Sequence, residues 1–192
     1  SLDVTDRTAM AAWIDQRDQA TALDLVIANA GVSAGLGESA VTTRRIFSTN
    51  LDGVLNTVLP ALDAFRRRRR GHIALISSLA SFRGMDSAPA YCASKAAIRV
   101  WGEGLRGALA PENIGVTVVC PGFVVSRITD ANTFPMPYLM SAEQSADIIQ
   151  RGIAANRGRV AFPWPMWAAV WVLSLLPDSC AGAIARMLPK KS

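Results

Sequence analysis

The stretch "LDLVIANAG", residues 23–31, decides the fold because it joins an unbroken apolar run to a turn of small residues. A short run of this kind, rich in β-branched residues, is typical of a strand buried on both faces. The Asn-Ala-Gly that follows carries little side-chain bulk, so another group can approach the backbone closely there. The stretch therefore predicts a buried strand whose carboxyl end borders a site.

Similar runs recur along the chain, separated by segments with helical spacing. The predicted strands are 23–31, 72–78, 116–122 and 159–163, and the predicted helices are 7–20, 41–69, 88–110 and 141–156. The last helix opens with Ser141 and Gln144 at the spacing of a capping box. Alternating strands and helices indicate βαβ units. We therefore expect an α/β fold: a Rossmann-like, doubly wound parallel sheet with helices on both faces.

Composition favours one globular unit. The chain has 192 residues, of which 51% are hydrophobic and 18% charged, which suits a single core rather than a disordered chain. We expect one domain over residues 1–192, with an apolar C-terminal helical extension at 164–189.

The net charge of +5 would allow an acidic partner, but much of it comes from one run, Arg66 to Arg70, directly before Gly71. Arginines in a last helical turn with glycine as the C-cap are typical of a solvated helix end. We expect this and no nucleic-acid partner; the alternative is a patch that binds an anionic partner.

The cysteine and histidine content argues against metal or thiol chemistry. Cys92, Cys120 and Cys180 show no CxxC spacing, and His72 is the only histidine. This pattern indicates a reduced, cytoplasmic protein without a zinc or iron site. It also disfavours a Cys/His catalytic pair.

Small and polar residues follow each predicted strand. In parallel sheets ligands bind at the carboxyl ends of strands, and here these ends carry Asn29 to Gly31, then Ser77, Ser78 and Ser81, and then Pro121, Gly122 and Ser126. Any one of them could simply turn the chain. Tyr91 and Lys95 stand one turn apart on the next helix, so both can approach the same small molecule.

Taken in order, Asp3-Val4, Asn29-Ala30-Gly31, Asn50, Ser78, Tyr91-x-x-x-Lys95 and Pro121-Gly122 resemble the short-chain dehydrogenase/reductase family. The Tyr-Lys spacing alone is common, and the resemblance rests on the full series in register over residues 1–163. It implies an oxidoreductase that transfers a hydride between NAD or NADP and an alcohol or ketone.

The resemblance also implies catalytic roles. Tyr91 would be the general acid or base, Ser78 would orient the substrate oxygen, and Lys95 would bind the nicotinamide ribose. Asn50 would hold a water that links Lys95 to solvent. A free phenol has a pKa of about 10, and we expect the positive charges of Lys95 and a cationic nicotinamide together to lower it.

For the cofactor, the resemblance implies that Asp3 contacts the adenine amino group with Val4 beside it. Asn29, Ala30 and Gly31 would border the adenosine ribose. The nicotinamide carboxamide would meet Pro121, Gly122, Val124 and Ser126, where serine replaces the threonine common in the family.

The chain departs from the family at its front. It contains no glycine-rich turn to seat a pyrophosphate on a helix N-terminus. We expect the first βαβ unit to be missing from this chain, which would leave it inactive alone. Leu2 to Val4 would then lack a parallel neighbour, and the strand at 24–29 would have an open edge.

Two apolar segments bear on substrate and surroundings. The family places a substrate lid between Ser126 and Ser141, and its apolar residues here favour a hydrophobic alcohol or carbonyl: Phe134, Met136, Pro137, Tyr138, Leu139 and Met140. A loop packed on the core is the alternative.

Trp164, Trp167 and Trp171 form one helical stripe in a run too short to span a bilayer. This stripe could pack in the core or against another subunit, lie in a membrane surface, or form a wall of the substrate pocket.

The family resemblance implies a homodimer or homotetramer formed through the helices at 41–69 and 88–110. Gly102, Gly104 and Gly107 would allow close contact there. The alternative function is a catalytically inactive binding or regulatory protein with the same fold, with membrane-surface contact through the tryptophan segment.

Overall fold

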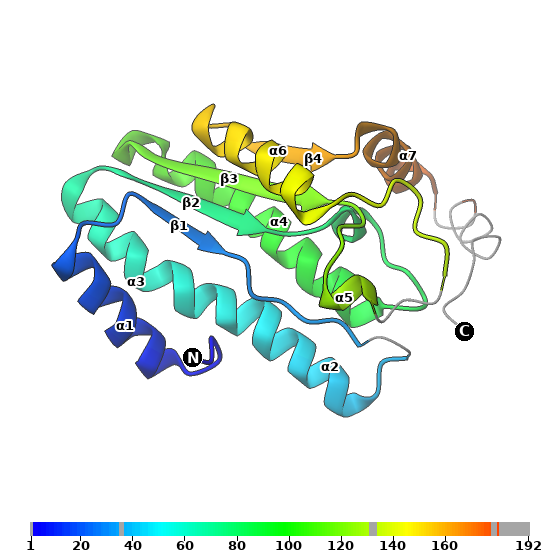
Figure 1. The fold of residues 1–192 in the computed structure, drawn as a ribbon, viewed down its shortest axis with the longest axis horizontal. Coiled ribbons are helices and arrows are strands. Elements are labelled where there is room, and N and C mark those ends of the chain that lie inside the picture. Colours follow the sequence, from blue (N-terminus) through cyan, green and yellow to red (C-terminus); the bar gives the residue numbers. More distant parts are fainter. Residues whose placement is uncertain (1, 35–36, 131–133, 178–179, 181–192) are drawn as a thin grey trace.

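The computed structural model describes residues 2–34, 37–130, 134–177 and 180 of the chain. Four parallel strands form its sheet in the order β1-β2-β3-β4, as Figure 1 shows. They are β1 (Leu25–Ala28), β2 (Gly71–Ile76), β3 (Ile114–Pro121) and β4 (Arg159–Phe162). The predicted parallel sheet is confirmed, with strand ends within three residues of the predicted ones.

The helices occupy the four predicted segments, the predicted lid segment and the C-terminal extension. They are α1 (Arg7–Ala20), α2 (Ala40–Phe47), α3 (Gly53–Arg68), α4 (Pro89–Leu109), α5 (Arg127–Asp130), α6 (Ala142–Ala154) and α7 (Trp164–Leu175). Short 3-10 turns, η2 (Leu79–Phe82) and η3 (Ala110–Glu112), flank α4. The predicted helix at 41–69 is divided, because a π-helical turn, η1 (Ser48–Asp52), separates α2 from α3. The capping box of Ser141 and Gln144 is confirmed at the start of α6.

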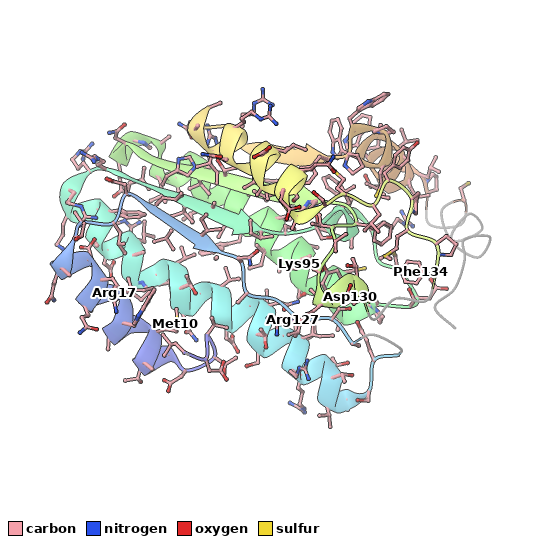
Figure 2. All side chains as sticks on the ribbon, viewed as in Figure 1. Met10, Arg17, Lys95, Arg127, Asp130 and Phe134 are labelled. Carbon is pink, nitrogen blue, oxygen red and sulfur yellow. The ribbon has the colours of Figure 1, made fainter. Side chains whose placement is uncertain are left out.

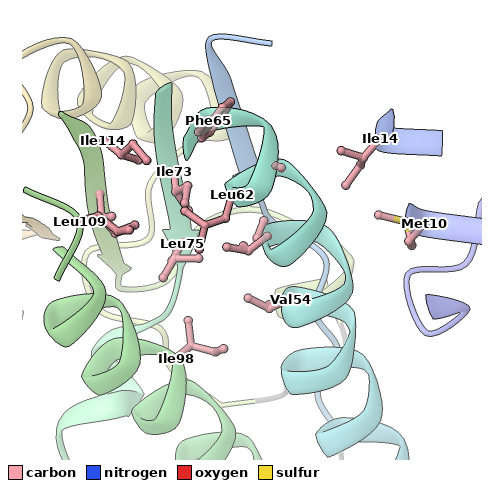
Figure 3. Packing of buried hydrophobic residues seen from close by; sticks show 14 residues of the cluster. Met10, Ile14, Val54, Leu62, Phe65, Ile73, Leu75, Ile98, Leu109 and Ile114 are labelled. Atoms are coloured by element: carbon pink, nitrogen blue, oxygen red, sulfur yellow. The ribbon is translucent and has the colours of Figure 1, made fainter. Parts of the chain in front are cut away.

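Helices cover both faces of the sheet because successive strand residues point to opposite sides. On one face, Phe65 of α3 and Ile98 of α4 belong to the main core together with Ile73 of β2, as Figure 3 shows. On the other face, Val119 and Val160 pack with Ile148 and Ile149 of α6. The sheet is therefore doubly covered, as predicted, and its strand ends remain available for a site.

β1 forms an edge of this sheet. Within the described residues it pairs only with β2, and its side chains Leu25 and Ile27 are 39% and 47% exposed. Leu2 to Val4 is not a strand; the Val4 carbonyl accepts from Asn56 Nδ2 of α3 at 2.9 Å. The predicted open edge is confirmed. The prediction that every strand is buried on both faces is wrong for β1, because a strand with one neighbour leaves part of its surface exposed.

The arginine run closes α3, but glycine is not its cap. Arg69 adopts the left-handed conformation with φ 51° and serves as the C-cap. Gly71 is required by packing instead: a Cβ there would lie 2.3 Å from Phe65 Cγ. The arginines form ion pairs with neighbouring elements, namely Arg66 with Glu112, Arg68 with Asp18 and Arg70 with Asp24. These contacts support the helix-end interpretation of the run.

The tryptophan stripe is split between the interior and the surface. Trp167 packs against a small cluster that contains Leu79, Val118 and Cys120, whereas Trp164 and Trp171 are 74% and 45% exposed. α7 ends at Leu175, and residues 178–179 and 181–189 of the predicted extension lie outside the described residues. None of the helices that the structure describes is long and apolar enough to cross a membrane.

Candidate active site

The first turns of α4 lie against the carboxyl end of β2. Lys95 is 3% exposed, and its Nζ donates to the Ile76 carbonyl at 2.9 Å. The Ser77 hydroxyl donates to the Lys95 carbonyl at 2.8 Å. Two hydrogen bonds of opposite direction thus fix the lysine to the strand end. Figure 2 shows Lys95 at the same end of the sheet as Asp130 and Phe134.

Ser78, Tyr91 and Lys95 are brought together as the sequence predicted. The Ser78 hydroxyl lies close enough to the Tyr91 phenol to lower its pKa. Lys95 Nζ lies 5.9 Å from the centroid of the Tyr91 ring. Ser78 is itself held in place, because its Oγ accepts from Ala80 N at 3.1 Å. A hydroxyl, a phenol and an amine therefore converge at one point of the strand ends.

Burial governs the acid-base state of this group. It raises the pKa of Tyr91, and the Ser78 hydroxyl only partly opposes the effect. Burial also lowers the pKa of Lys95 from 10.5 to about 8. Desolvation penalises both charged forms in this structure, and the lowering of the Tyr91 pKa by Lys95 together with a cationic nicotinamide stays a prediction. The phenol is protonated at neutral pH, as a general acid must be.

Asn50 lies in the π-helical turn and is fully buried. Its Oδ1 accepts from Val32 N at 2.8 Å, and its Nδ2 donates to the Val32 carbonyl at 3.1 Å and to Ser94 Oγ at 3.0 Å. Single π-helical turns are frequent at functional sites. Here the turn directs an amide into the space between α4 and the segment that follows β1.

Gly31 links Asn50 to the lysine. A Cβ at Gly31 would lie 3.1 Å from Lys95 Nζ and 3.5 Å from Asn50 Oδ1. The absence of a side chain therefore keeps the space beside the ammonium open. Asn29 and Ala30, which precede this glycine at the end of β1, are exposed and half-buried respectively.

The segment after β3 is anchored at several points. Gly122 N donates to the Phe162 carbonyl at 2.7 Å, and a Cβ at Gly122 would lie 2.9 Å from Met166 Sδ. Val124 forms a parallel bridge with Met140. Ser126 N donates to Thr129 Oγ1 at 2.8 Å, which orders the start of α5. Together with Pro121, these residues form one border of the site.

Asp3 and Val4 are fixed differently. Asp3 Oδ1 accepts from both the backbone N and the hydroxyl of Thr5 at 2.9 Å, which lowers the pKa of this exposed carboxyl. Val4 packs against Gly53, where a Cβ would lie 2.6 Å from Val4 Cγ2. Residues 2–4 do not pair with β1 in the described sheet.

The predicted lid is partly packed and partly exposed. Phe134 meets Phe123 edge to face with 5.9 Å between ring centroids, and Met140 N donates to the Phe123 carbonyl at 3.0 Å. Tyr138 and Leu139 are 60% and 45% exposed. Part of this segment is therefore packed on its surroundings and part is exposed, and its role as a substrate lid stays a prediction. In the described part of the chain, no group of three or more His, Cys, Asp or Glu side chains could hold a metal ion.

Sequence reasoning missed Glu38. Its Oε2 accepts from Ala90 N at 2.6 Å and its Oε1 from Tyr91 N at 3.1 Å. The signal in the sequence was an absence: Ala88 stands where a capping side chain would, so α4 needs an acceptor from elsewhere.

Comparison with known proteins shows which family this chain is similar to. A family model described as short chain dehydrogenase matches residues 1–134. An uncharacterized oxidoreductase of Myxococcus xanthus is 38% identical over 191 residues, which cover 97% of this chain and 76% of the relative. A protein of Xanthobacter autotrophicus, described as inactive 2-(S)-hydroxypropyl-CoM dehydrogenase 2, is 36% identical over a match that covers 65% of this chain and 56% of that protein.

Among solved structures, a short chain dehydrogenase from Burkholderia cenocepacia in complex with NADP superposes with a TM-score of 0.82. It covers 98% of this chain and 78% of that one, and at 22% identity it supports the fold alone. The family model and the Myxococcus relative settle membership: this chain belongs to the short-chain dehydrogenase family of oxidoreductases.

Proposed function

We propose that the protein is an NAD(P)-dependent alcohol dehydrogenase or carbonyl reductase that acts on a small apolar substrate. The observation that carries the proposal is the grouping of Ser78 and Tyr91 beside the buried Lys95, whose Nζ lies 5.9 Å from the centroid of the Tyr91 ring. In a family of oxidoreductases, this group at the carboxyl ends of the strands is suited to proton transfer at a carbonyl or hydroxyl oxygen.

The strand ends fit the cofactor. The open space at Gly31 lies beside Lys95 Nζ, so a ribose hydroxyl could approach the ammonium. Residues proposed to hold NAD or NADP are Asp3, Val4, Asn29, Ala30, Gly31, Tyr91, Lys95, Pro121, Gly122, Val124 and Ser126. When bound, this cofactor supplies or accepts the hydride.

The residues of the chain then manage the proton. Ser78 donates a hydrogen bond to the substrate oxygen and holds it at the phenol. In reduction, Tyr91 Oη gives its proton to that oxygen; in oxidation, the phenolate takes the proton back. Lys95 Nζ favours the phenolate once it forms, and Asn50 would hold a water that returns protons from solvent.

The lid supports an apolar substrate. Phe123 and Phe134 place aromatic rings at the segment that follows β3, and Leu139 adds an exposed aliphatic side chain. Pockets of this lining favour hydrophobic ligands over sugars. We therefore propose an apolar alcohol or ketone as the substrate class.

We further propose that the protein forms a homodimer or homotetramer through α2, α3 and α4. Val41, Leu59 and Val100 on these helices are 77%, 48% and 59% exposed. At Gly104 and Gly107, no atom lies within 4 Å of the place that a Cβ would take, so a partner could approach both. Gly102 does not belong to this surface: a Cβ there would lie 2.6 Å from Leu75 and Val118 of the same chain.

The direct test is Tyr91→Phe in the full-length protein, assayed for reduction of apolar ketones with NADH and with NADPH. We expect loss of turnover with cofactor binding retained. The matched control is Tyr138→Phe, since Tyr138 is the other tyrosine and is largely exposed. Full turnover by Tyr91→Phe would refute the assigned chemistry.

A second candidate is a catalytically inactive protein of the same fold that binds a ligand or regulates. The similarity to the Xanthobacter protein, which is described as inactive, supports this second candidate. Surface contact of α7 with a membrane belongs to this candidate, because Trp164 and Leu175 are 74% and 65% exposed. Cofactor binding without turnover on any of a broad panel of alcohols and ketones would select it, and a cytoplasmic location is proposed in either case.

A further inference from the structure

We infer that Glu38 is a positioning residue that holds the start of α4, and with it the Tyr91 phenol, in the geometry needed for proton transfer. The inference rests on the proposed function for its catalytic consequence. Its structural part, a carboxylate that tethers the helix start, can be tested independently.

The first turn of α4 lacks a local cap. Ala88 is the N-cap and offers no side-chain acceptor, and Pro89 has no backbone N–H. Cys92 N already donates to the Ala88 carbonyl at 3.0 Å, so the intrahelical ladder begins there. The donors that remain in this turn are the backbone N–H groups of Ala90 and Tyr91.

One carboxylate accepts from both. Glu38 Oε2 lies 2.6 Å from Ala90 N, and Oε1 lies 3.1 Å from Tyr91 N. A negative charge at a helix N-terminus is favoured by the helix dipole, and hydrogen bonds to a charged acceptor are stronger than neutral ones. The arrangement acts as an N-cap supplied from a distant part of the chain.

Glu38 directly precedes the ordered start of α2. The next residue, Ser39, caps α2, where its Oγ accepts from Thr42 N at 3.2 Å. The tether therefore joins the beginnings of two helices, α2 and α4, which also contact each other.

Tyr91 is the member of the site that needs this support. Lys95 is fixed one turn deeper by the Ile76 carbonyl, and Ser78 is fixed by Ala80 N. Tyr91 stands in the first turn, where helices fray. A displacement of about 1 Å at a reacting group can lower a rate about a hundredfold, so the tether places the phenol against the other two residues.

The test compares Glu38→Gln and Glu38→Ala with Asp6→Asn and Asp6→Ala in the full-length protein. Asp6 is a matched control, because its carboxylate caps α1 by accepting from Ala9 N at 3.0 Å and touches no residue of α4 in the described contacts. Steady-state kinetics, thermal unfolding and backbone amide hydrogen exchange are measured for each.

We expect Glu38→Ala to lower kcat by about tenfold to a hundredfold, with KM for the cofactor little changed. The kcat of Glu38→Gln, which keeps one acceptor oxygen, should fall between the kcat of Glu38→Ala and that of the wild type. Both Asp6 variants should lower the unfolding temperature without this loss in kcat. Equal losses of kcat in Glu38→Ala and Asp6→Ala would overturn the positioning role, as would unchanged kcat in Glu38→Ala.

Hydrogen exchange separates this inference from the proposed function. The amides of Ala90 and Tyr91 should exchange at least about tenfold faster in Glu38→Ala, since a lost charged hydrogen bond of about 1.4 kcal/mol or more corresponds to that factor. Unchanged exchange at both amides refutes the tether even in an active enzyme. A wild-type protein without turnover refutes the proposed function, while faster exchange would still establish the tether.

Discussion

The Ser77 hydroxyl donates a 2.8 Å hydrogen bond to the backbone carbonyl of Lys95, whose own Nζ donates at 2.9 Å to the carbonyl of Ile76. Neighbouring residues at the end of β2 thus hold both the backbone and the side chain of the same lysine. This pairing fixes the register between strand and helix. It explains how a lysine can be 3% exposed and still have a defined position beside Tyr91.

The first prediction concerns Ser77. Ser77→Ala removes one buried hydrogen bond and should lower the free energy of unfolding by about 1 kcal/mol, or the unfolding temperature by about 2–4 °C. Ser174→Ala is the control, because the Ser174 hydroxyl bonds within an exposed turn of α7. Thermal unfolding followed by circular dichroism measures both. Equal decreases in the unfolding temperature would show that the buried hydrogen bond of Ser77 stabilises the fold no more than the exposed one of Ser174.

The second prediction concerns the charge on Lys95. Its pKa is about 8 in the folded chain against 10.5 for the free side chain. Between these values the unfolded chain binds more protons, so this group's contribution to stability is present above pH 10.5 and is lost as pH falls through 8. At pH 7 the buried charge should cost on the order of 3 kcal/mol.

Lys95→Met removes that cost. We expect the variant to be more stable than the wild type at pH 7, and the difference to shrink towards pH 10, while turnover is lost. Urea unfolding at both pH values measures it. A variant that is less stable than the wild type at pH 7 would show that the ammonium is better compensated than its burial implies.

The sequence predicted the elements well because their signals are local. The apolar run at 23–31 and the Ser141 capping box each depend on a few neighbouring residues, and both appear in the structure. Tyr91 and Lys95 could be placed together because helical geometry alone fixes their spacing.

The remaining features depend on contacts between distant segments. Nothing in the sequence around residue 50 marks a π-helical turn, since Asn50 is held there by Val32 and Ser94. Glu38 is 53 residues from Tyr91. The rise in the pKa of Tyr91 could not be predicted either, because burial is a property of the folded chain.

The third prediction concerns acid stability. His72 Nε2 lies 2.9 Å from Thr117 Oγ1, whose hydroxyl donates to the Arg157 carbonyl at 2.7 Å. Burial, together with the positive charge of Arg106, lowers the pKa of His72 below its usual 6.5. The unfolded chain therefore takes up this proton first, so stability is full above pH 6.5 and falls as the solution is acidified.

His72→Gln should flatten that dependence. We expect the free energy of unfolding of the wild type to decrease between pH 7 and pH 5 more steeply than that of the variant. The Asp18 carboxylate, whose pKa is lowered by its hydrogen bond with Arg68, titrates at lower pH and does not obscure this window. Denaturant titrations across the range measure both slopes, and parallel slopes would rule out His72 as the origin.

The last prediction contrasts two glycines of α4. A Cβ at Gly102 would lie 2.6 Å from both Leu75 Cδ1 and Val118 Cγ2, so Gly102→Ala should overpack the core at a cost of about 1–3 kcal/mol. Gly104 has no atom within 4 Å of the same position, so Gly104→Ala should gain about 0.5–1 kcal/mol of helix stability. The two substitutions are chemically identical and should shift the unfolding temperature in opposite directions. Light scattering of Gly104→Ala adds a test of assembly: if subunits pack on this surface, the added methyl group should weaken the oligomer, whereas unchanged assembly would place the subunit contact elsewhere.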